Sequence, residues 1–142
     1  MRFIVLVTLG LTCCLSAMAA DENTIQRHQL GTWEDDIGYS GVVEAGNQLY
    51  ISGIACEGET MTLAVKACYE NIQSILKKFS ATSDQIIKET IYTTDIDALI
   101  KVIPMRKSFF NKGLYPAATW VQVSRLYDPK HLLEIELIVQ LK

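Results

Sequence analysis

The chain has 142 residues, 49% of them hydrophobic, and a formal net charge of −3. This length suits one compact domain, and the apolar content is enough to bury a core. The acidic balance, with no basic cluster, argues against nucleic acid as a partner, because binding a phosphate backbone requires many basic groups.

Residues 1–20 read as a secretory signal peptide rather than as part of the fold. A short positive start precedes the apolar run Phe3–Leu15, and small residues follow in Ser16–Ala20. A membrane anchor is the alternative, but about 13 apolar residues are too few to span a bilayer. Lipid attachment at Cys13 or Cys14 is disfavoured by the residues that precede them. The sequence predicts secretion, with the periplasm as the expected compartment and no membrane contact after cleavage.

Two cysteines, Cys56 and Cys68, remain after the signal segment. In an oxidising compartment an even pair favours one disulfide. Two buried thiols acting as small apolar groups are the alternative. Both readings stay open, because the distance between the two Cα atoms is not visible in a sequence.

The first half of the mature chain is predicted to form an arm, a hairpin and a helix. Residues 21–36 are polar and acidic, which favours a loosely held N-terminal arm. Two β-type runs, 41–45 and 48–53, meet at a Gly-Asn turn and predict a hairpin. Residues 60–79 carry an apolar stripe at three- and four-residue steps, which predicts the main helix.

The second half is predicted to add a strand, a helix and two more strands. Residues 86–94 are rich in β-branched residues. A second helix should begin near Asp95 or Asp97, break near Pro104 and end by Gly113. Strands are expected over 118–126 and 132–141. The order β-β-α-β-α-β-β predicts an α+β domain, in which two helices cover one face of a mixed sheet.

Two acids, Glu134 and Glu136, alternate on the last predicted strand and therefore share one face. Burying a charged carboxylate among Leu, Ile and Val costs free energy, so these acids are expected either to be solvated or to have a functional role. For Glu134, a catalytic role and a structural role, in which the acid pairs with Arg125 or with a backbone amide across the sheet, are both open. For Glu136, the solvated or structural reading is favoured.

The end of the chain resembles the RidA/YjgF family, also called the reactive intermediate deaminase or endoribonuclease L-PSP family. The resemblance rests on Pro116-Ala117, on Val121–Leu126 and on Glu134-Ile135-Glu136, with looser agreement at Leu49–Gly53. It covers the RidA-like domain, residues 37–142, and implies a chorismate-mutase-like fold. It also implies a homotrimer with small-molecule clefts between subunits.

The resemblance further implies chemistry that needs no metal or organic cofactor. Family deaminases hydrolyse 2-imino or 2-enamino acids to 2-keto acids and ammonia. By analogy, Glu134 would hold the attacking water, and the backbone at Ser52-Gly53 would help position the substrate. Tyr39 lies near the position of a cleft tyrosine.

Ala118 is the decisive departure from the family pattern, because that position normally holds the arginine that binds the substrate carboxylate. Arg106 is the one candidate for a relocated anchor, on a different predicted element. Trp120 stands where a small residue is common. It either narrows and lines the cleft or fills the trimer interior.

Three functions follow in order of preference. The first is binding of a small metabolite or altered imine and enamine chemistry, with standard 2-imino acid deamination weak or absent. The second is a true deaminase with a moved anchor. The third is a ribonuclease, which the acidic charge and export oppose. His28 and His131 are isolated in the sequence, so no metal site is expected and both are read as surface residues.

Overall fold

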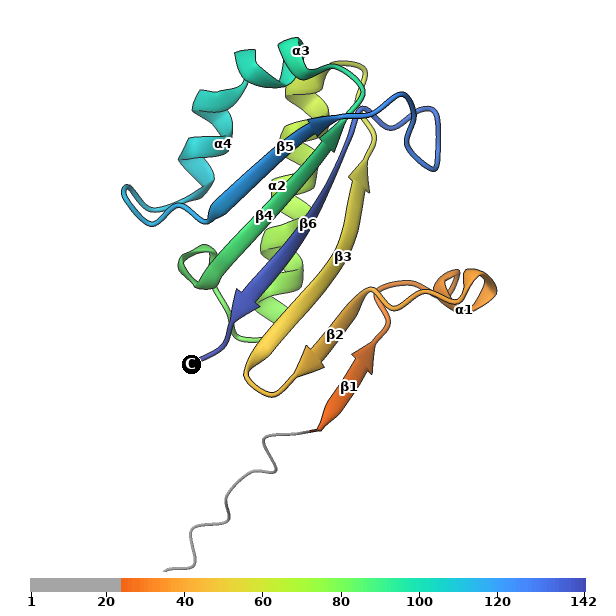
Figure 1. Cartoon of the computed structure of the whole chain (residues 1–142), viewed down its shortest axis with the longest axis vertical. Coiled ribbons are helices and arrows are strands. Elements are labelled where there is room, and N and C mark those ends of the chain that lie inside the picture. Colours follow the sequence, from red (N-terminus) through yellow and green to blue (C-terminus); the bar gives the residue numbers. More distant parts are fainter. Residues whose placement is uncertain (1–23) are drawn as a thin grey trace, which may run out of the picture.

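The computed structural model describes residues 24–142, which form one six-stranded sheet with helices on one face (Figure 1). The expected signal peptide lies outside the described residues. The strands are β1 (Ile25–His28), β2 (Val42–Ala45), β3 (Gln48–Cys56), β4 (Ile86–Thr93), β5 (Ala117–Gln122) and β6 (Leu133–Gln140). The helices are α1 (Glu34–Ile37), α2 (Met61–Lys78), α3 (Ile96–Lys101) and α4 (Ile103–Phe109), with a 3-10 turn at Ser83–Gln85.

The strand order in the sheet is β1-β2-β3-β6-β4-β5. All neighbouring strands run antiparallel except β4 and β5, which run parallel. The predicted α+β class and the mixed sheet are confirmed. The strands β5 and β6 follow each other in the chain, yet β4 lies between them, so they are not a hairpin. The strand β5 ends at Gln122, four residues earlier than predicted, and the chain then leaves the sheet.

The loosely held arm expected for residues 21–36 is not what residues 24–36 form. Residues Ile25–His28 pair with β2 as an edge strand, and a short helix follows. The carboxylate of Glu34 is fully buried and accepts backbone N–H bonds from Leu30, Gly31 and Gly41. A buried charge is tolerated when it is hydrogen-bonded in this way, so Glu34 organises the segment that precedes β2.

The predicted main helix is confirmed as α2. The Thr60 hydroxyl accepts a bond from the backbone N–H of Leu63 and caps the helix N-terminus. Four residues of the predicted apolar stripe, Val65, Cys68, Ile72 and Ile75, are buried against the sheet, and the fifth, Phe79, is partly buried. The charged side chains of α2 are exposed. Among residues 24–142, no helix is both long and apolar enough to span a membrane.

The predicted break near Pro104 is also confirmed, because the second helical segment divides into α3 and α4 at Val102. The carboxylate of Asp95 caps α3 by accepting from the Ala98 N–H. Pro104 lies in the first turn of α4, where its missing N–H would have no helical partner. The break sets the direction of α4 and thus the place of Arg106.

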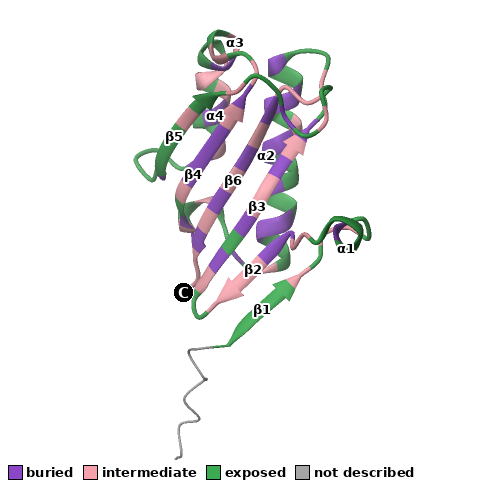
Figure 2. Cartoon of the chain, turned by 45° about the vertical axis from the view of Figure 1, so that its right-hand side comes forward, coloured by how far each residue is buried: buried purple, intermediate pink, exposed green. Residues whose placement is uncertain are grey.

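Burial alternates strictly along the central strand β6. Its side chains at Leu133, Ile135, Leu137 and Val139 are buried under the helices, and the residues between them are only partly buried (Figure 2). This alternation confirms that Glu134 and Glu136 share a face. That face is the one without helices, and we call it the open face.

The cysteines Cys56 and Cys68 form a disulfide, with their Cα atoms 5.4 Å apart. Both residues are buried, and the bond ties the end of β3 to the middle of α2. Of the two readings that the sequence left open, the disulfide is the one that the structure contains.

Replacing both cysteines by alanine should lower the free energy of unfolding by about 2–4 kcal/mol, because the cross-link restricts the unfolded chain. Urea denaturation at fixed protein concentration measures the change. A reductant should destabilise the wild type by a similar amount and leave the Cys56→Ala/Cys68→Ala variant unaffected. Equal midpoints for wild type and variant would contradict the prediction.

Candidate functional site

The predicted site residues separate into two groups in a single subunit. Four of them gather where β3 meets the N-terminal segment and β6, namely Tyr39, Ser52, Gly53 and Glu134. The other two, Ala118 and Trp120, lie on the edge strand β5. Since β6 and β4 separate β3 from β5, the two groups do not meet within one subunit.

Gly53 lies against the carboxylate of Glu134. The pairing of β3 with β6 shifts register between Ile51 and Ile54, which indicates a bulge at this point. A Cβ at Gly53 would collide with Glu134 Oε1 and displace that side chain, so glycine lets the carboxylate lie against the β3 backbone. The contact fixes Glu134 beside the backbone that was predicted to position a substrate.

Tyr39 joins the same neighbourhood from the end of α1. Its hydroxyl donates to the Gly53 carbonyl at 3.1 Å, and its ring lies 5.3 Å from that of Trp33, centroid to centroid. Gly38, with φ of 69°, adopts the left-handed conformation that ends α1 and directs the chain back towards β3. Burial raises the pKa of the Tyr39 phenol, and the nearby Glu134 carboxylate raises it further.

Glu134 has the properties of an acid–base group. Burial raises the pKa of its carboxyl group, the charge of Glu136 raises it further, and His131 opposes the shift. Within residues 24–142, no hydrogen bond or ion pair engages the Glu134 carboxylate. The structural pairing with Arg125 is not formed, because Arg125 donates to the carbonyls of Leu126 and Tyr127. A carboxylate without a partner and with a raised pKa is suited to exchanging protons with water.

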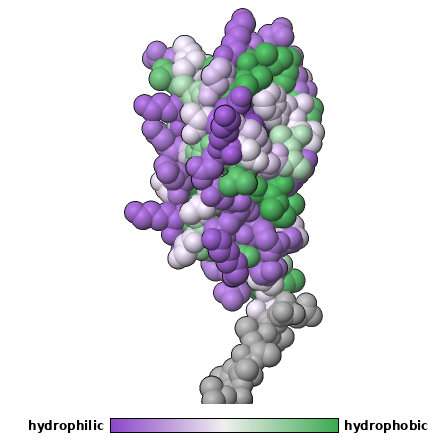
Figure 3. Space-filling model, turned by 90° about the vertical axis from the view of Figure 1, so that its left-hand side faces the viewer, coloured by the Kyte–Doolittle hydropathy of each residue, from purple (hydrophilic) through white to green (hydrophobic). Residues whose placement is uncertain are grey.

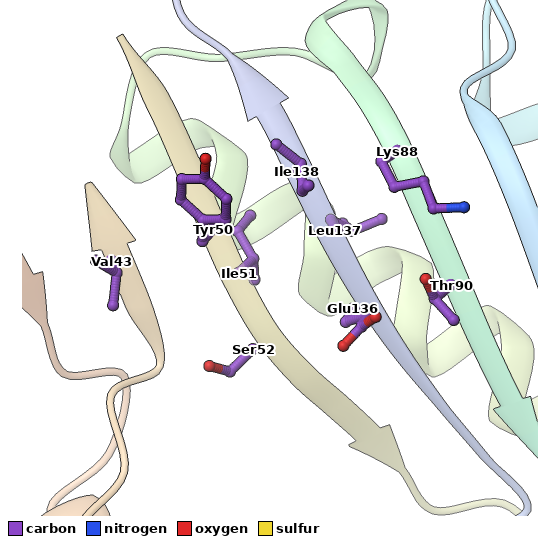
Figure 4. Close-up of a pocket in the computed structure, with 9 residues that line it drawn as sticks. All are labelled: Val43, Tyr50, Ile51, Ser52, Lys88, Thr90, Glu136, Leu137 and Ile138. Carbon is purple, nitrogen blue, oxygen red and sulfur yellow. The ribbon is translucent and has the colours of Figure 1, made fainter. Parts of the chain in front are cut away.

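Glu136 lies farther along the open face, in a different setting. It accepts a hydrogen bond from the Tyr92 hydroxyl at 3.3 Å. It also borders a hollow of about 320 Å³ on the open face, whose lining includes Val43, Tyr50, Ser52, Lys88, Thr90 and Ile138 (Figure 4). The structural, partly solvated reading therefore fits Glu136.

Ala118 and Trp120 face the helices rather than the open face. In the parallel register Ala118 pairs with Glu89 and Trp120 pairs with Ile91, and both partners are buried under the helices. The Trp120 ring lies 5.2 Å from the Arg106 guanidinium of α4, and its Nε1 is buried without a partner. Thus Trp120 packs inside its own subunit, which neither sequence reading of this residue anticipated.

Arg106 is engaged in a buried cluster and is not a free anchor. Its Nε and Nη2 atoms lie 2.7 and 2.5 Å from Glu89 Oε2, and the Tyr69 hydroxyl donates to Glu89 Oε1 at 2.6 Å. Both charged side chains are almost fully buried, and burial together with the Glu89 charge raises the pKa of Tyr69. Sequence reasoning missed Glu89 and Tyr69, because their partners are distant along the chain.

His28 is also less isolated than predicted. Its Nε2 lies 3.1 Å from Glu44 Oε2, and its ring packs edge-on against Phe79. It is half-buried and helps fix β1 to β2 and α2. The described residues contain no cluster of three or more His, Cys, Asp or Glu side chains that could hold a metal.

A family model described as Endoribonuclease L-PSP matches residues 34–141. The chain belongs to the RidA/YjgF family. Curated relatives agree, since a RutC family protein of Pyrococcus abyssi is 31% identical over 109 residues, covering 70% of this chain and 84% of the relative. The RutC family protein UK114 of Drosophila melanogaster is 31% identical over 108 residues, covering 70% and 77%.

Solved structures of RidA/YjgF proteins share the fold. Rv2704 of Mycobacterium tuberculosis, a member of the YjgF/YER057c/UK114 family, has a TM-score of 0.76 and 25% identity. The similarity covers 83% of this chain and all of that one. The Rid family protein YyfA of Yersinia pestis has a TM-score of 0.68 and 27% identity, with 72% and 87% covered. The predicted RidA-like fold is confirmed.

Replacing Glu134 by glutamine should stabilise this RidA/YjgF protein near pH 7 and have little effect near pH 4. A raised pKa means that the ionised carboxylate is disfavoured in the folded state relative to the unfolded chain. Wild type should therefore lose stability as pH rises from the unfolded pKa through the folded one, whereas the amide should not. Urea denaturation across this range measures the difference.

Glu57→Gln, in the exposed loop after β3, is the matched control for the same change of acid to amide at a solvated position. A Glu134→Gln variant that is equally stable, or less stable, than wild type near pH 7 would contradict the interpretation of Glu134 as a disfavoured charge.

Proposed function

We propose that this chain is an exported, homotrimeric RidA/YjgF protein with a small-molecule cleft between subunits, in which standard 2-imino acid deamination is weak or absent. The proposal rests on the two positions from which an arginine was expected to bind the substrate carboxylate, neither of which offers an available guanidinium. Ala118 replaces the anchoring arginine, and Arg106 is bound to Glu89.

Electrostatics disfavours strong deamination in such a cleft. An imino acid keeps its carboxylate charge throughout hydrolysis, and a cleft without a cation must desolvate that charge unaided. Losing a bidentate charged contact costs about 3 kcal/mol, which is about a hundredfold in binding. Glu134, when ionised, would add repulsion. Ligands without a carboxylate avoid both costs and could still meet water held by Glu134.

The alternative, an active deaminase with a moved anchor, loses support at Arg106. Glu89 Oε2 already accepts two N–H groups of Arg106. The Arg106 guanidinium also lies over the rings of Phe110 and Trp120, 5.0 and 5.2 Å from their centroids. A ribonuclease function has less support still, because the chain is acidic and carries no basic stripe.

The disulfide supports the proposal of export to the periplasm. A buried Cys56–Cys68 bond suits an oxidising compartment, as does the apolar N-terminal sequence. Mass spectrometry of the native protein tests this proposal, and an intact Met1 start in the cytoplasm would refute it.

The sheet supports the proposed trimer. Apolar side chains such as Tyr50 remain on the open face, which the helices do not cover. The β5 and α4 side of the molecule also carries hydrophobic patches between hydrophilic side chains (Figure 3), and Leu114, Tyr115 and Val121 are exposed on and before β5. A neighbouring subunit would cover such surface and could bring Ala118 and Glu134 of different copies together.

Light scattering of the wild type should give three times the subunit mass. Tyr50→Asp should dissociate the trimer, because it places a charge on the open face, which the neighbouring subunits would bury. Ile100→Asp on α3 is the matched control, since the two side chains are similarly exposed at 43% and 49% but lie on opposite faces of the sheet. A wild type that is a stable monomer at micromolar concentration would contradict the proposal.

The rate of hydrolysis of 2-iminopropanoate, generated in situ, tests whether the loss of the carboxylate-binding arginine at position 118 lowers deaminase activity. Wild type should have kcat/KM about a hundredfold below that of an arginine-bearing family member. Ala118→Arg should raise the rate if Trp120 leaves room for the guanidinium. Adding Glu134→Ala to Ala118→Arg should remove the gain, because the water would lose its acceptor. Wild-type activity equal to that of the arginine-bearing protein would overturn the proposal.

A further inference from the structure

A second hollow, of about 510 Å³, lies where the C-terminal end of α2 turns towards β4. Its volume is within the range of small-molecule sites. We call it the turn pocket, and its lining includes Leu76, Lys77, Ser80, Ala81, Ser83 and Phe109. We propose that the turn pocket binds a phosphate monoester of a small aromatic group, with Lys77 and the serine hydroxyls holding the phosphate.

The turn itself contains a serine in an uncommon backbone conformation. Ser80 has a φ of 54°, and among residues 24–142 it is the one non-glycine residue with positive φ. It follows α2, where the Ala81 N–H donates to the Leu76 carbonyl and the Ser80 N–H donates to the Lys77 carbonyl. Glycine is the usual residue at such a position, because a Cβ is disfavoured in the left-handed region. A serine held here places a hydroxyl at the pocket at the expense of stability, and such strain is typical of ligand sites.

The charge that the turn pocket presents to a ligand is positive. Lys77 lies in the last turn of α2, and among residues 24–142 no hydrogen bond or ion pair engages its ammonium group. No described acidic side chain lines the pocket. Asp84, which follows Ser83 in the chain, instead accepts a hydrogen bond from the Asn111 side chain at 2.6 Å. An ammonium group without a partner attracts an anion, and lysine is a common ligand of phosphate.

Neutral donors border the pocket from α2 and from the turn. Gln73 lies one helical turn before Lys77 on the same face of α2, and Ser80 and Ser83 follow the helix. Within the described part of the chain, these three side chains have no hydrogen-bond partner. Donors in several directions suit the three acceptor oxygens of a phosphate monoester better than the two coplanar oxygens of a carboxylate.

The floor of the turn pocket is apolar. Leu76 and Ala81 are only 2% and 8% exposed, and Phe109 is half-buried. The Phe109 ring is held in place, because its centroid lies 4.6 Å from that of Tyr69 and 5.1 Å from that of Phe110. An inorganic ion would leave this surface unused, whereas a planar apolar group attached to the phosphate would contact it.

The turn pocket is separate from the candidate functional site, so the inference goes beyond the proposed function. The turn leads into Ile86, which pairs with Val139 near the end of β6, whereas Glu134 lies near the start of β6. The two places are thus at opposite ends of the sheet (Figure 1). The pocket is bordered by α2 and the end of α4, on the face opposite to Glu134. A trimer that buries the open face would leave it accessible.

Phenyl phosphate is the probe, followed by NMR of the folded protein labelled with ¹⁵N. It should shift the backbone amide signals of Ala81 and Ser83 saturably and leave that of Gly53, in the candidate functional site, in place. Benzyl alcohol, which lacks the charge, and inorganic phosphate, which lacks the ring, should each bind more weakly. The affinity for phenyl phosphate should rise with pH, because a phosphate monoester acquires its second negative charge near about pH 6.

Lys77→Gln should weaken the binding of phenyl phosphate about fivefold, the effect of losing one exposed charge pair. Lys78→Gln is the matched control, because the neighbouring lysine carries the same charge but does not line the turn pocket. Ser80→Gly and Ser80→Ala should both weaken binding, since both remove the hydroxyl. The glycine variant should have the higher Tm of the two, because only glycine relieves the strain, so a loss of binding in both variants is not a loss of folding.

Equal affinities of the Lys77 and Lys78 variants, or wild-type affinity in both Ser80 variants, would overturn the inference. A shift of the Gly53 signal without one at Ala81 would overturn it as well, because the ligand would then lie in the candidate functional site. Inorganic phosphate that binds as tightly as phenyl phosphate would also overturn it, since the pocket would then hold an adventitious ion only.

Discussion

The one-sided burial of the sheet is the constraint on which the rest of the structure depends. The helices α2, α3 and α4 cover one face, so every inward side chain of β6 is apolar and every second residue is left to the open face. Glu134 lies on that open face beside Gly53, where it is partly buried, and this burial raises the pKa of its carboxyl group. The same constraint leaves apolar surface such as Tyr50 uncovered by the helices.

The helix-covered face contains a buried charge pair among otherwise apolar side chains. Glu89 and Arg106 are almost fully buried, and Tyr69 completes the cluster. Burying such a pair costs desolvation that its attraction only partly repays, while removing one partner alone costs about 3–5 kcal/mol. The cluster therefore keeps the Arg106 guanidinium close to β5 but neutralised by Glu89. An arginine near β5 does not by itself replace the carboxylate-binding arginine that is missing at position 118.

The open face near Gly53 presents two acids, Glu134 and Glu136. A carboxylate without a partner destabilises the fold when ionised, and such local costs are typical of sites retained for function.

The sequence by itself determined the elements, since caps, apolar stripes and alternation are local: Thr60 and Pro104 mark helix boundaries that the structure reproduces. The tertiary structure alone decided which elements meet. It placed β4 between β5 and β6, turned Ala118 away from Glu134, and joined Arg106 to Glu89. It also added β1, a four-residue strand with three exposed residues, whose pattern is too weak to predict. Strand register and side-chain pairing arise from contacts between residues distant in the chain, and no local pattern encodes them.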